Sequence, residues 1–279
     1  MNSDTVLYQL TETSAFMMSF VIVTKKNNAI IIDGGREEDI PLLKEYVGGR
    51  HISAWIITHG HQDHISGMMT EYLENKWRDF DIEKIYCKFP PEDAVPEGDL
   101  EWCIPAFNKH LPEFKEKVHF VEQGESVQID ELKIDFIFTY HSEIDADYMN
   151  NSSMVFKVNG PKKSVIFLGD IGPESGDHLY RESKHLLKAD IVQMSHHGGS
   201  CCGMEVYSAI KPEACLWCCR KESYEGKGFG ARVFTEGYAD NLMNFPLRRF
   251  PVTVTREWMD FLGVKTHYVS GYGTNKIII

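Results

Sequence analysis

Long apolar runs and targeting signals are the first things that this sequence lacks. No stretch of its 279 residues approaches the roughly 18 consecutive apolar residues of a transmembrane helix. The N-terminal stretch MNSDTVLYQLTETSAF has no basic segment followed by an apolar core, so we expect no signal peptide. Both absences favour a cytoplasmic protein without membrane contact.

Cysteines suited to a disulfide framework are also lacking. The seven cysteines are an odd number, and two of the possible pairs, Cys201-Cys202 and Cys218-Cys219, are neighbours in sequence. This layout favours reduced thiols in the cytoplasm. Cys215 and Cys218 form a C-x-x-C, but they lie in an apolar run without a well-spaced second pair, so we interpret them as core residues.

Positive charge is scarce as well. The chain carries 29 basic and 41 acidic residues, a formal net charge of -12. A general nucleic-acid-binding protein needs a basic footprint, which this balance does not provide. A local basic channel remains compatible with it, and bound divalent cations would offset part of the negative charge. The pair Arg248-Arg249 is a candidate contact for an anionic substrate, although a solvated surface pair is the simpler interpretation.

What the sequence does contain is a regular alternation of short β-rich runs and amphipathic stretches. We expect strands in the runs 20–24, 29–33, 54–58, 84–89, 132–140, 153–158, 164–170, 190–195, 214–219, 265–270 and 275–279. We expect helices over 37–49, 66–77, 176–189 and 255–263. The alternation predicts an α/β fold, and the lack of a flexible linker predicts one domain over 1–279.

A faint internal repeat sharpens this prediction. A strand ending in an acid, then a helix, then a strand ending in histidines occurs in the first half as IIIDGG … IITHGHQDH. The same order returns in the second half as IFLGDIG … DIVQMSHHGG. Two related βαβ halves would bring both histidine clusters to one edge, where the carboxyl ends of the strands present their loops.

The segment THGHQDH is the strongest chemical signal. His59, His61, Asp63 and His64 place four metal-ligand side chains within six positions directly after an apolar strand. Imidazole and carboxylate are good ligands for zinc, iron and manganese ions. A lone histidine is usually structural, but four such donors at one strand end indicate a metal site.

This segment resembles the HxHxDH signature of the metallo-β-lactamase-fold hydrolases. The other landmarks follow in the family's order and cover nearly the whole chain. The resemblance implies a four-layer αββα sandwich with two divalent metal ions, zinc in first place and manganese or iron as alternatives. It assigns His59 and His61 to the first metal, Asp63 and His64 to the second, and Asp170 as the bridge between them.

The family's remaining ligand positions can be assigned to this sequence in more than one way. One histidine of the late pair would complete the second site, with His196 favoured and His197 as the alternative, either as a ligand or as a group facing substrate. Asp33 would orient a ligand by a hydrogen bond. The family's third histidine for the first metal is missing. Asn151 stands at roughly that place, and His141 is the nearest histidine upstream.

The stretch NNSSMVFKV … SVIFLGD … DIVQMSHHG resembles the ComEC-type subgroup associated with competence and DNA uptake. The resemblance implies hydrolysis by a hydroxide that two metals activate, with Asp63 and Asp170 able to position it and one of the two able to accept its proton. A phosphodiester in a nucleic acid or nucleotide is the favoured substrate, and a lactone, thioester or other ester is the alternative. Without membrane segments, DNA uptake itself is not implied, and the oligomeric state is left open.

Two further classes compete with the hydrolase. A metal-binding module with weakened turnover is favoured by the missing third histidine. A two-iron redox protein of the same fold would place carboxylates inside the first motif and would use a flavin domain. This chain has Gln62 in the first motif and no flavin domain. The hydrolase therefore remains the main expectation.

Overall fold

The structure, a computed structural model, describes residues 4–15, 17–227 and 250–279. Each of the eleven predicted runs overlaps a strand, because β-branched and aromatic residues suit a buried, pleated surface. The strands are β1 (Val6–Gln9), β2 (Ser19–Val23), β3 (Ala29–Asp33), β4 (His51–Ile56), β5 (Asp81–Ile82), β6 (Ile85–Cys87), β7 (Val118–Phe120), β8 (Ser126–Ile129), β9 (Leu132–Phe138), β10 (Val155–Asn159), β11 (Ser164–Phe167), β12 (Ile191–Gln193), β13 (Ala214–Trp217), β14 (Thr266–Val269) and β15 (Asn275–Ile278). Short strands such as β1, β5, β7 and β8 have no clear sequence signal.

The helices follow the predictions where the apolar spacing is regular. They are α1 (Ile40–Val47), α2 (Gln62–Asn75), α3 (Cys103–Phe114), α4 (Tyr148–Asn151), α5 (Pro173–Ser183), α6 (Met204–Ile210), α7 (Lys221–Tyr224) and α10 (Val252–Phe261). Helix α1 ends where Gly48 adopts the left-handed conformation at φ 58°. Helix α3 was not predicted, because Pro105 and Pro112 interrupt its pattern.

The strands pair into two mixed sheets. The first has the order β15-β1-β2-β3-β4-β6-β7, with β5 beside β4, and the second has the order β14-β13-β12-β11-β10-β9-β8. In each sheet one side is antiparallel and the other parallel: β3, β4, β6 and β7 are parallel neighbours, as are β11 to β14. The parallel parts place the strand ends that carry chemistry at a common edge.

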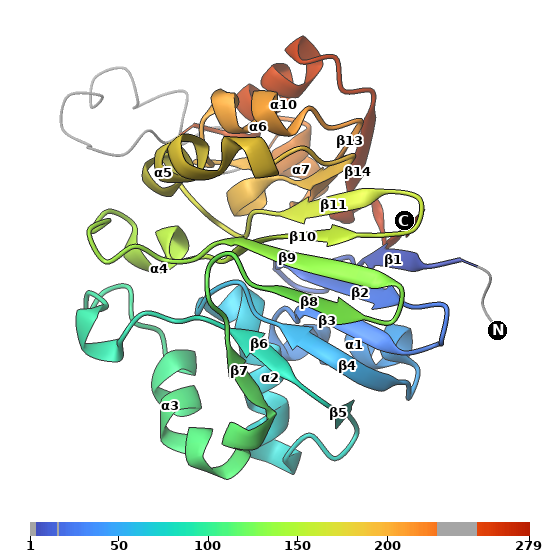
Figure 1. The fold of residues 1–279 in the computed structure, drawn as a ribbon, viewed down its shortest axis with the longest axis vertical. Coiled ribbons are helices and arrows are strands. Elements are labelled where there is room, and N and C mark those ends of the chain that lie inside the picture. The colour runs from blue at the N-terminus through green and yellow to red at the C-terminus, as the bar shows by residue number, and fades with distance from the viewer. Residues whose placement is uncertain (1–3, 16, 228–249) are drawn as a thin grey trace.

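The sheets stack face to face between two layers of helices. Inward-facing side chains of both sheets share one apolar cluster, in which the rings of Phe20 and Phe167 meet edge to face at 5.1 Å. A second cluster joins the first sheet to α1, α2 and α3, and a third joins the second sheet to α5, α6 and α10. Figure 1 shows α5, α6 and α10 above the sheets and α2 and α3 below them. The αββα sandwich is therefore confirmed.

The predicted internal repeat is present as two βαβ units. In the first, β3 and β4 are parallel and α1 connects them. In the second, β11 and β12 are parallel and α5 connects them. The segments after β4, β11 and β12 meet at one edge of the sandwich, because side chains from all three are in contact there. This edge carries the candidate site.

The remaining compositional predictions concern thiols and membranes. All seven cysteines are free and buried, and Cys215 and Cys218 belong to the core as predicted. Among the described residues, no helix combines the length and apolarity needed to cross a membrane. Arg248 and Arg249 lie outside the described residues.

Candidate metal centre

The histidine motif is divided between a loop and a helix. Strand β4 ends at Ile56, and the chain runs through Thr58 and His59 to His61, the N-cap of α2. The sequence predicted that α2 begins at residue 66, but it begins at Gln62, so Asp63 and His64 lie in its first turn. The carboxylate of Asp63 is favourably placed at the positive end of the helix dipole.

Three donors form the first group of the centre. His59 Nε2 lies 3.2 Å from His61 Nδ1, and His61 Nδ1 lies 2.8 Å from the side-chain oxygen of Asn150 in α4. The amide of Asn150 is oriented because its nitrogen donates a hydrogen bond to Asp147 at 3.0 Å. Two imidazole nitrogens and one amide oxygen thus converge at one place.

Three donors and a shared carboxylate form the second group. His197 Nε2 lies 2.9 Å from an Asp63 oxygen, and His64 Nε2 lies 3.8 Å from the same carboxylate. Asp170, which follows β11, places one oxygen 3.3 Å from His64 Nε2 and 3.4 Å from His197 Nε2. His59, His64 and Asp170 also have donor atoms within 4.8 Å of one another, so Asp170 lies between the two groups.

Each histidine of the second group is held by a second contact behind it. Asp33 lies 2.9 Å from His64 Nδ1 and also accepts a hydrogen bond from the backbone N–H of Thr58 at 2.7 Å. His197 Nδ1 donates to the carbonyl oxygen of Cys218 at 2.7 Å. Such contacts select the tautomer in which Nε2 presents its lone pair to the centre. The expected orienting position of Asp33 matches this geometry.

The charges of the second group are strongly coupled. Burial by itself lowers the pKa of His197, but the carboxylates of Asp170 and Asp63 outweigh it and raise this pKa to about 10. Burial likewise opposes protonation of His64, and Asp170 and Asp33 raise its pKa well above the usual value. Without a cation, the buried carboxylates are therefore balanced by protons on imidazoles, and a bound cation would take the place of those protons.

The arrangement fits metal ions on the chemistry of its donors. Around a tetrahedral ion with bonds of about 2.0–2.1 Å, neighbouring donors are separated by about 3.3 Å. The separations of 3.2, 3.3 and 3.4 Å match this spacing. The buried atoms without a hydrogen-bond partner among the described residues include His64 Nε2 and Asp170 Oδ1. Buried polar atoms are rarely left in this state unless an ion or a water satisfies them.

Three of the sequence predictions differ from the observed placement. His196 was favoured over His197, but His196 is directed toward the backbone oxygen of Ser200 at 3.5 Å, and it is His197 that reaches the carboxylates. The two residues form a turn with positive φ angles of 48° and 56°, which sends their side chains in different directions. Strand periodicity cannot anticipate that turn.

The proposed replacements for the missing histidine are also placed elsewhere. Asn151 uses its oxygen to accept hydrogen bonds from the backbone N–H groups of Gly172 and Ser175, at 2.8 and 3.3 Å, and its nitrogen donates to Ala146. It therefore anchors the start of α5 and does not face the centre. His141 lies beside His178 and Glu182, away from the centre. The amide that does face the centre belongs to Asn150, one position earlier.

Two acidic residues of the centre were missed. The stretch over 90–102 is rich in acidic residues and prolines, and it delivers Asp99 and Glu101 to the site. Asp99 lies 3.0 Å from His61 Nε2 and also accepts a hydrogen bond from the backbone N–H of Met149 at 2.7 Å. Glu101 accepts from the backbone N–H of Gln62. The acidity of the loop was the available signal, but nothing in the sequence showed where the loop docks.

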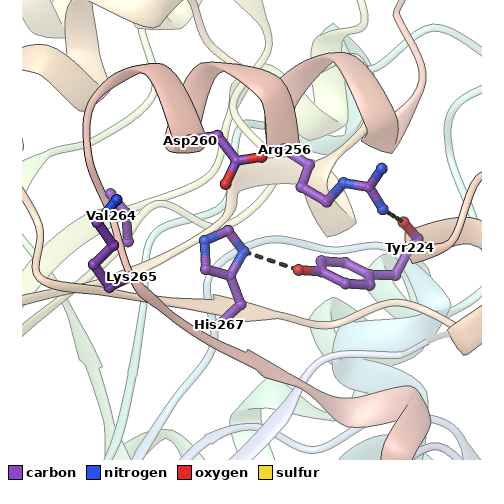
Figure 2. Close-up of a pocket in the computed structure, with 6 residues that line it drawn as sticks. All are labelled: Tyr224, Arg256, Asp260, Val264, Lys265 and His267. Atoms are coloured by element: carbon purple, nitrogen blue, oxygen red, sulfur yellow. Dashed lines mark hydrogen bonds between the residues drawn. The ribbon is translucent and has the colours of Figure 1, made fainter.

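A separate hollow of about 510 Å³ lies beside α10, α7 and β14. Figure 2 shows Arg256 and Asp260 reaching from α10 toward Tyr224 and His267. Its polar groups satisfy one another, since the Tyr224 hydroxyl lies 3.0 Å from His267 Nδ1 and Arg256 donates to the Tyr224 carbonyl oxygen. The hollow shares no residue with the donor groups above, so the chemistry is assigned to the donor groups.

The fold is that of metallo-β-lactamase-fold proteins, and the donor groups at its edge form a candidate site for metal ions. The sequence model of the family described as "Anti-Pycsar protein Apyc1" matches residues 10–199, well over half of the chain. The chain therefore belongs to this family.

Individual relatives agree with this placement. ComE operon protein 3 of Bacillus subtilis (strain 168) is 25% identical over 183 residues, which are 65% of this chain and 22% of that protein. The chain thus spans about a fifth of this relative, and the match supports the ComEC-type resemblance. Among solved structures, the metallo-beta-lactamase fold protein YhfI from Bacillus subtilis covers 98% of this chain and 99% of its own, with a TM-score of 0.55 and 12% identity. CmlA, a diiron beta-hydroxylase from Streptomyces venezuelae, covers 100% and 55%, with a TM-score of 0.56 and 12% identity. These two structures show the fold alone.

Proposed function

We propose that the protein hydrolyses a phosphodiester, in a nucleotide or a nucleic acid, with two divalent metal ions. The observation that carries the proposal is the position of the Asp170 carboxylate between two groups of donors, 3.3 Å from His64 and 3.4 Å from His197. A shared carboxylate is the arrangement that holds two cations close together. Zinc is the first choice because imidazole nitrogens dominate the donor set, and manganese or iron are alternatives.

The residues divide into two sets of ligands. His59, His61 and Asn150 would hold the first ion, and Asp63, His64 and His197 would hold the second, with Asp170 shared. When bound, two such cations lower the pKa of a shared water and neutralise charge on the phosphoryl oxygens in line with it. A buried site with few competing polar groups strengthens these interactions.

The protein's own groups then orient the reaction. Asp63 is 8% exposed and reaches the centre from the first turn of α2, so its carboxylate can hold the attacking water and accept its proton. Asp33 and the Cys218 carbonyl hold His64 and His197 in the tautomers that bind a cation. In this proposal His197 serves as a ligand and not as a group that faces substrate.

A second candidate function is a metal-binding module with weakened turnover. The observation that favours it is the amide of Asn150 at the place of a third imidazole. An amide oxygen is a weaker ligand than imidazole for zinc-like ions, so the first ion would bind less tightly than the second.

Metal content and turnover separate the two candidates. The chain is purified without chelator, its metal content is measured by elemental analysis, and hydrolysis of bis(p-nitrophenyl) phosphate is compared with that of p-nitrophenyl acetate. We expect at least two ions per chain and a preference for the phosphodiester that chelation abolishes and zinc or manganese restores. Preference for the acetate ester would redirect the proposal to an esterase. One ion, with turnover of neither compound after metal is restored, would establish the binding module.

A further inference from the structure

A second cluster of metal-ligating side chains lies outside the centre. His141 follows strand β9, and His178 and Glu182 lie one turn apart on helix α5. One donor atom from each of the three lies within 4.8 Å of the other two. None of them belongs to the donor groups described above, so the proposed hydrolysis assigns them no role.

The distances in the cluster are too long for hydrogen bonds. His141 Nε2 lies 3.7 Å from one oxygen of Glu182, and His178 Nδ1 lies 3.8 Å from the other. Hydrogen bonds between such atoms are about 2.7–3.2 Å long. The observed separations are closer to the roughly 3.3 Å between donors around a tetrahedral zinc ion. The side chain of Glu182 is 42% exposed, and binding an ion would require its carboxylate to move toward the two rings.

The ring of His141 is already held in the orientation that a metal ligand needs. Its other nitrogen, Nδ1, lies 3.2 Å from an oxygen of Glu143, and its ring stacks on Phe138 with centroids 4.8 Å apart and planes 14° apart. When Nδ1–H donates to that carboxylate, Nε2 keeps its lone pair and presents it toward Glu182. A carboxylate behind the ring is the support that ligating histidines have in metal sites.

We propose that His141, His178 and Glu182 bind a third divalent transition-metal ion, zinc in first place. Two imidazoles and one carboxylate suit zinc and leave the fourth position to a water. The ion would fasten the segment over 139–147 to helix α5. That segment leads directly into α4, which carries Asn150, and Asn151 anchors the start of α5. In Figure 1, α4 and α5 lie at the same end of the sandwich.

The test separates this ion from the two at the centre. The double variant His59→Ala/Asp170→Asn disables the centre, and its zinc content is measured by titration against a chromophoric chelator. To this background His178→Ala is added, with His185→Ala as the matched control because His185 is an exposed histidine just beyond the same helix. We expect one equivalent of zinc in the background and in the control, and its loss with His178→Ala.

The same pair of variants is measured in the otherwise unchanged chain, in case the disabled centre impairs folding. There, His178→Ala is expected to hold one equivalent less than His185→Ala, while each keeps its two central ions. Equal zinc content in the two variants would overturn the proposal. Because the readout is bound zinc, a protein that fails to cleave phosphodiesters would still pass or fail this test on its own.

Discussion

The two donor groups of the centre are built in different ways. The second group has two imidazoles and a carboxylate, and Asp33 and a β13-end carbonyl support its histidines from within the sandwich. The first group has two imidazoles and an amide, and its outer histidine, His61, is supported by Asp99 from the loop over 90–102. His64 is fully buried, whereas the His61 side chain is 18% exposed.

This difference indicates that groups of the core orient the ligands of the second metal position, whereas loop residues orient those of the first. The groups that support its histidines, Asp33 at the end of β3 and the Cys218 carbonyl directly after β13, are attached to packed strands, so the second group is ordered before any ion binds. The first group depends on two connecting segments that meet at Asp99, which contacts both His61 and the backbone of Met149. We therefore expect the second position to bind its ion more tightly than the first.

The largest effect is expected from substituting Asp170, the residue that both donor groups share. Asp170→Asn removes the negative charge between them, so both ions should bind poorly. Turnover of bis(p-nitrophenyl) phosphate should fall on the order of 10²–10³-fold or more. The matched control is Asp177→Asn on α5, which should retain both ions. Two tightly bound ions in Asp170→Asn would contradict the bridging position.

The next effect distinguishes the adjacent histidines of the second group. His197→Ala should remove the second ion and most of the turnover, while His196→Ala should keep both. The pair is well matched, because both residues have a positive φ and each alanine therefore carries a similar backbone cost. Metal content and melting temperature are measured together. Loss of the second ion in His196→Ala, but not in His197→Ala, would identify His196 as the ligand.

A smaller and more selective effect is expected from the loop. Asp99→Asn keeps the size of the side chain but weakens the contact that orients His61. Affinity for the first ion should fall about 10–100-fold, with the second ion unaffected. Asp93→Asn, an exposed residue of the same loop, serves as the control. If both ions weaken equally in Asp99→Asn, the two positions are not independent and the comparison fails.

The smallest effect is expected from a substitution that reduces the difference in metal affinity between the two donor groups. Asn150→His supplies a third imidazole, so affinity for the first ion should rise about tenfold, or about 1.4 kcal/mol. Asn151→His is the control one position later. It should give no such gain and should cost about 1–2 kcal/mol of stability, because the N–H groups at the start of α5 lose their acceptor. Isothermal titration and thermal unfolding measure the two quantities. A gain in Asn151→His would identify it as the ligand.

Prediction from the sequence succeeded where the signal was local. The runs that became β3, β4, β11 and β12 are mainly apolar and largely buried, as expected of parallel strands that are covered on both faces. The acid or histidine after each such strand then had to lie at a strand end. The resemblance added the pairing of the two halves, and the placement of Asp170 beside His64 agrees with it.

Prediction failed where a side chain's direction depends on a turn or on a distant segment. Asn150 and Asn151 are adjacent and lie in the single turn of α4. Neighbouring side chains there point about 100° apart. The choice between His196 and His197 depended on a left-handed turn. Asp99 could not be placed because the loop over 90–102 has no periodicity.

The sequence by itself determined the class of the fold, the edge at which the chemistry lies and the residue types that meet there, because hydrophobic periodicity and strand ends are local properties. Only the tertiary structure decided which of two adjacent histidines faces Asp63, which of two adjacent asparagines faces His61, and that Asp99 supports that histidine. These choices depend on backbone turns and on contacts between segments far apart in the chain, and no local pattern of residues encodes them.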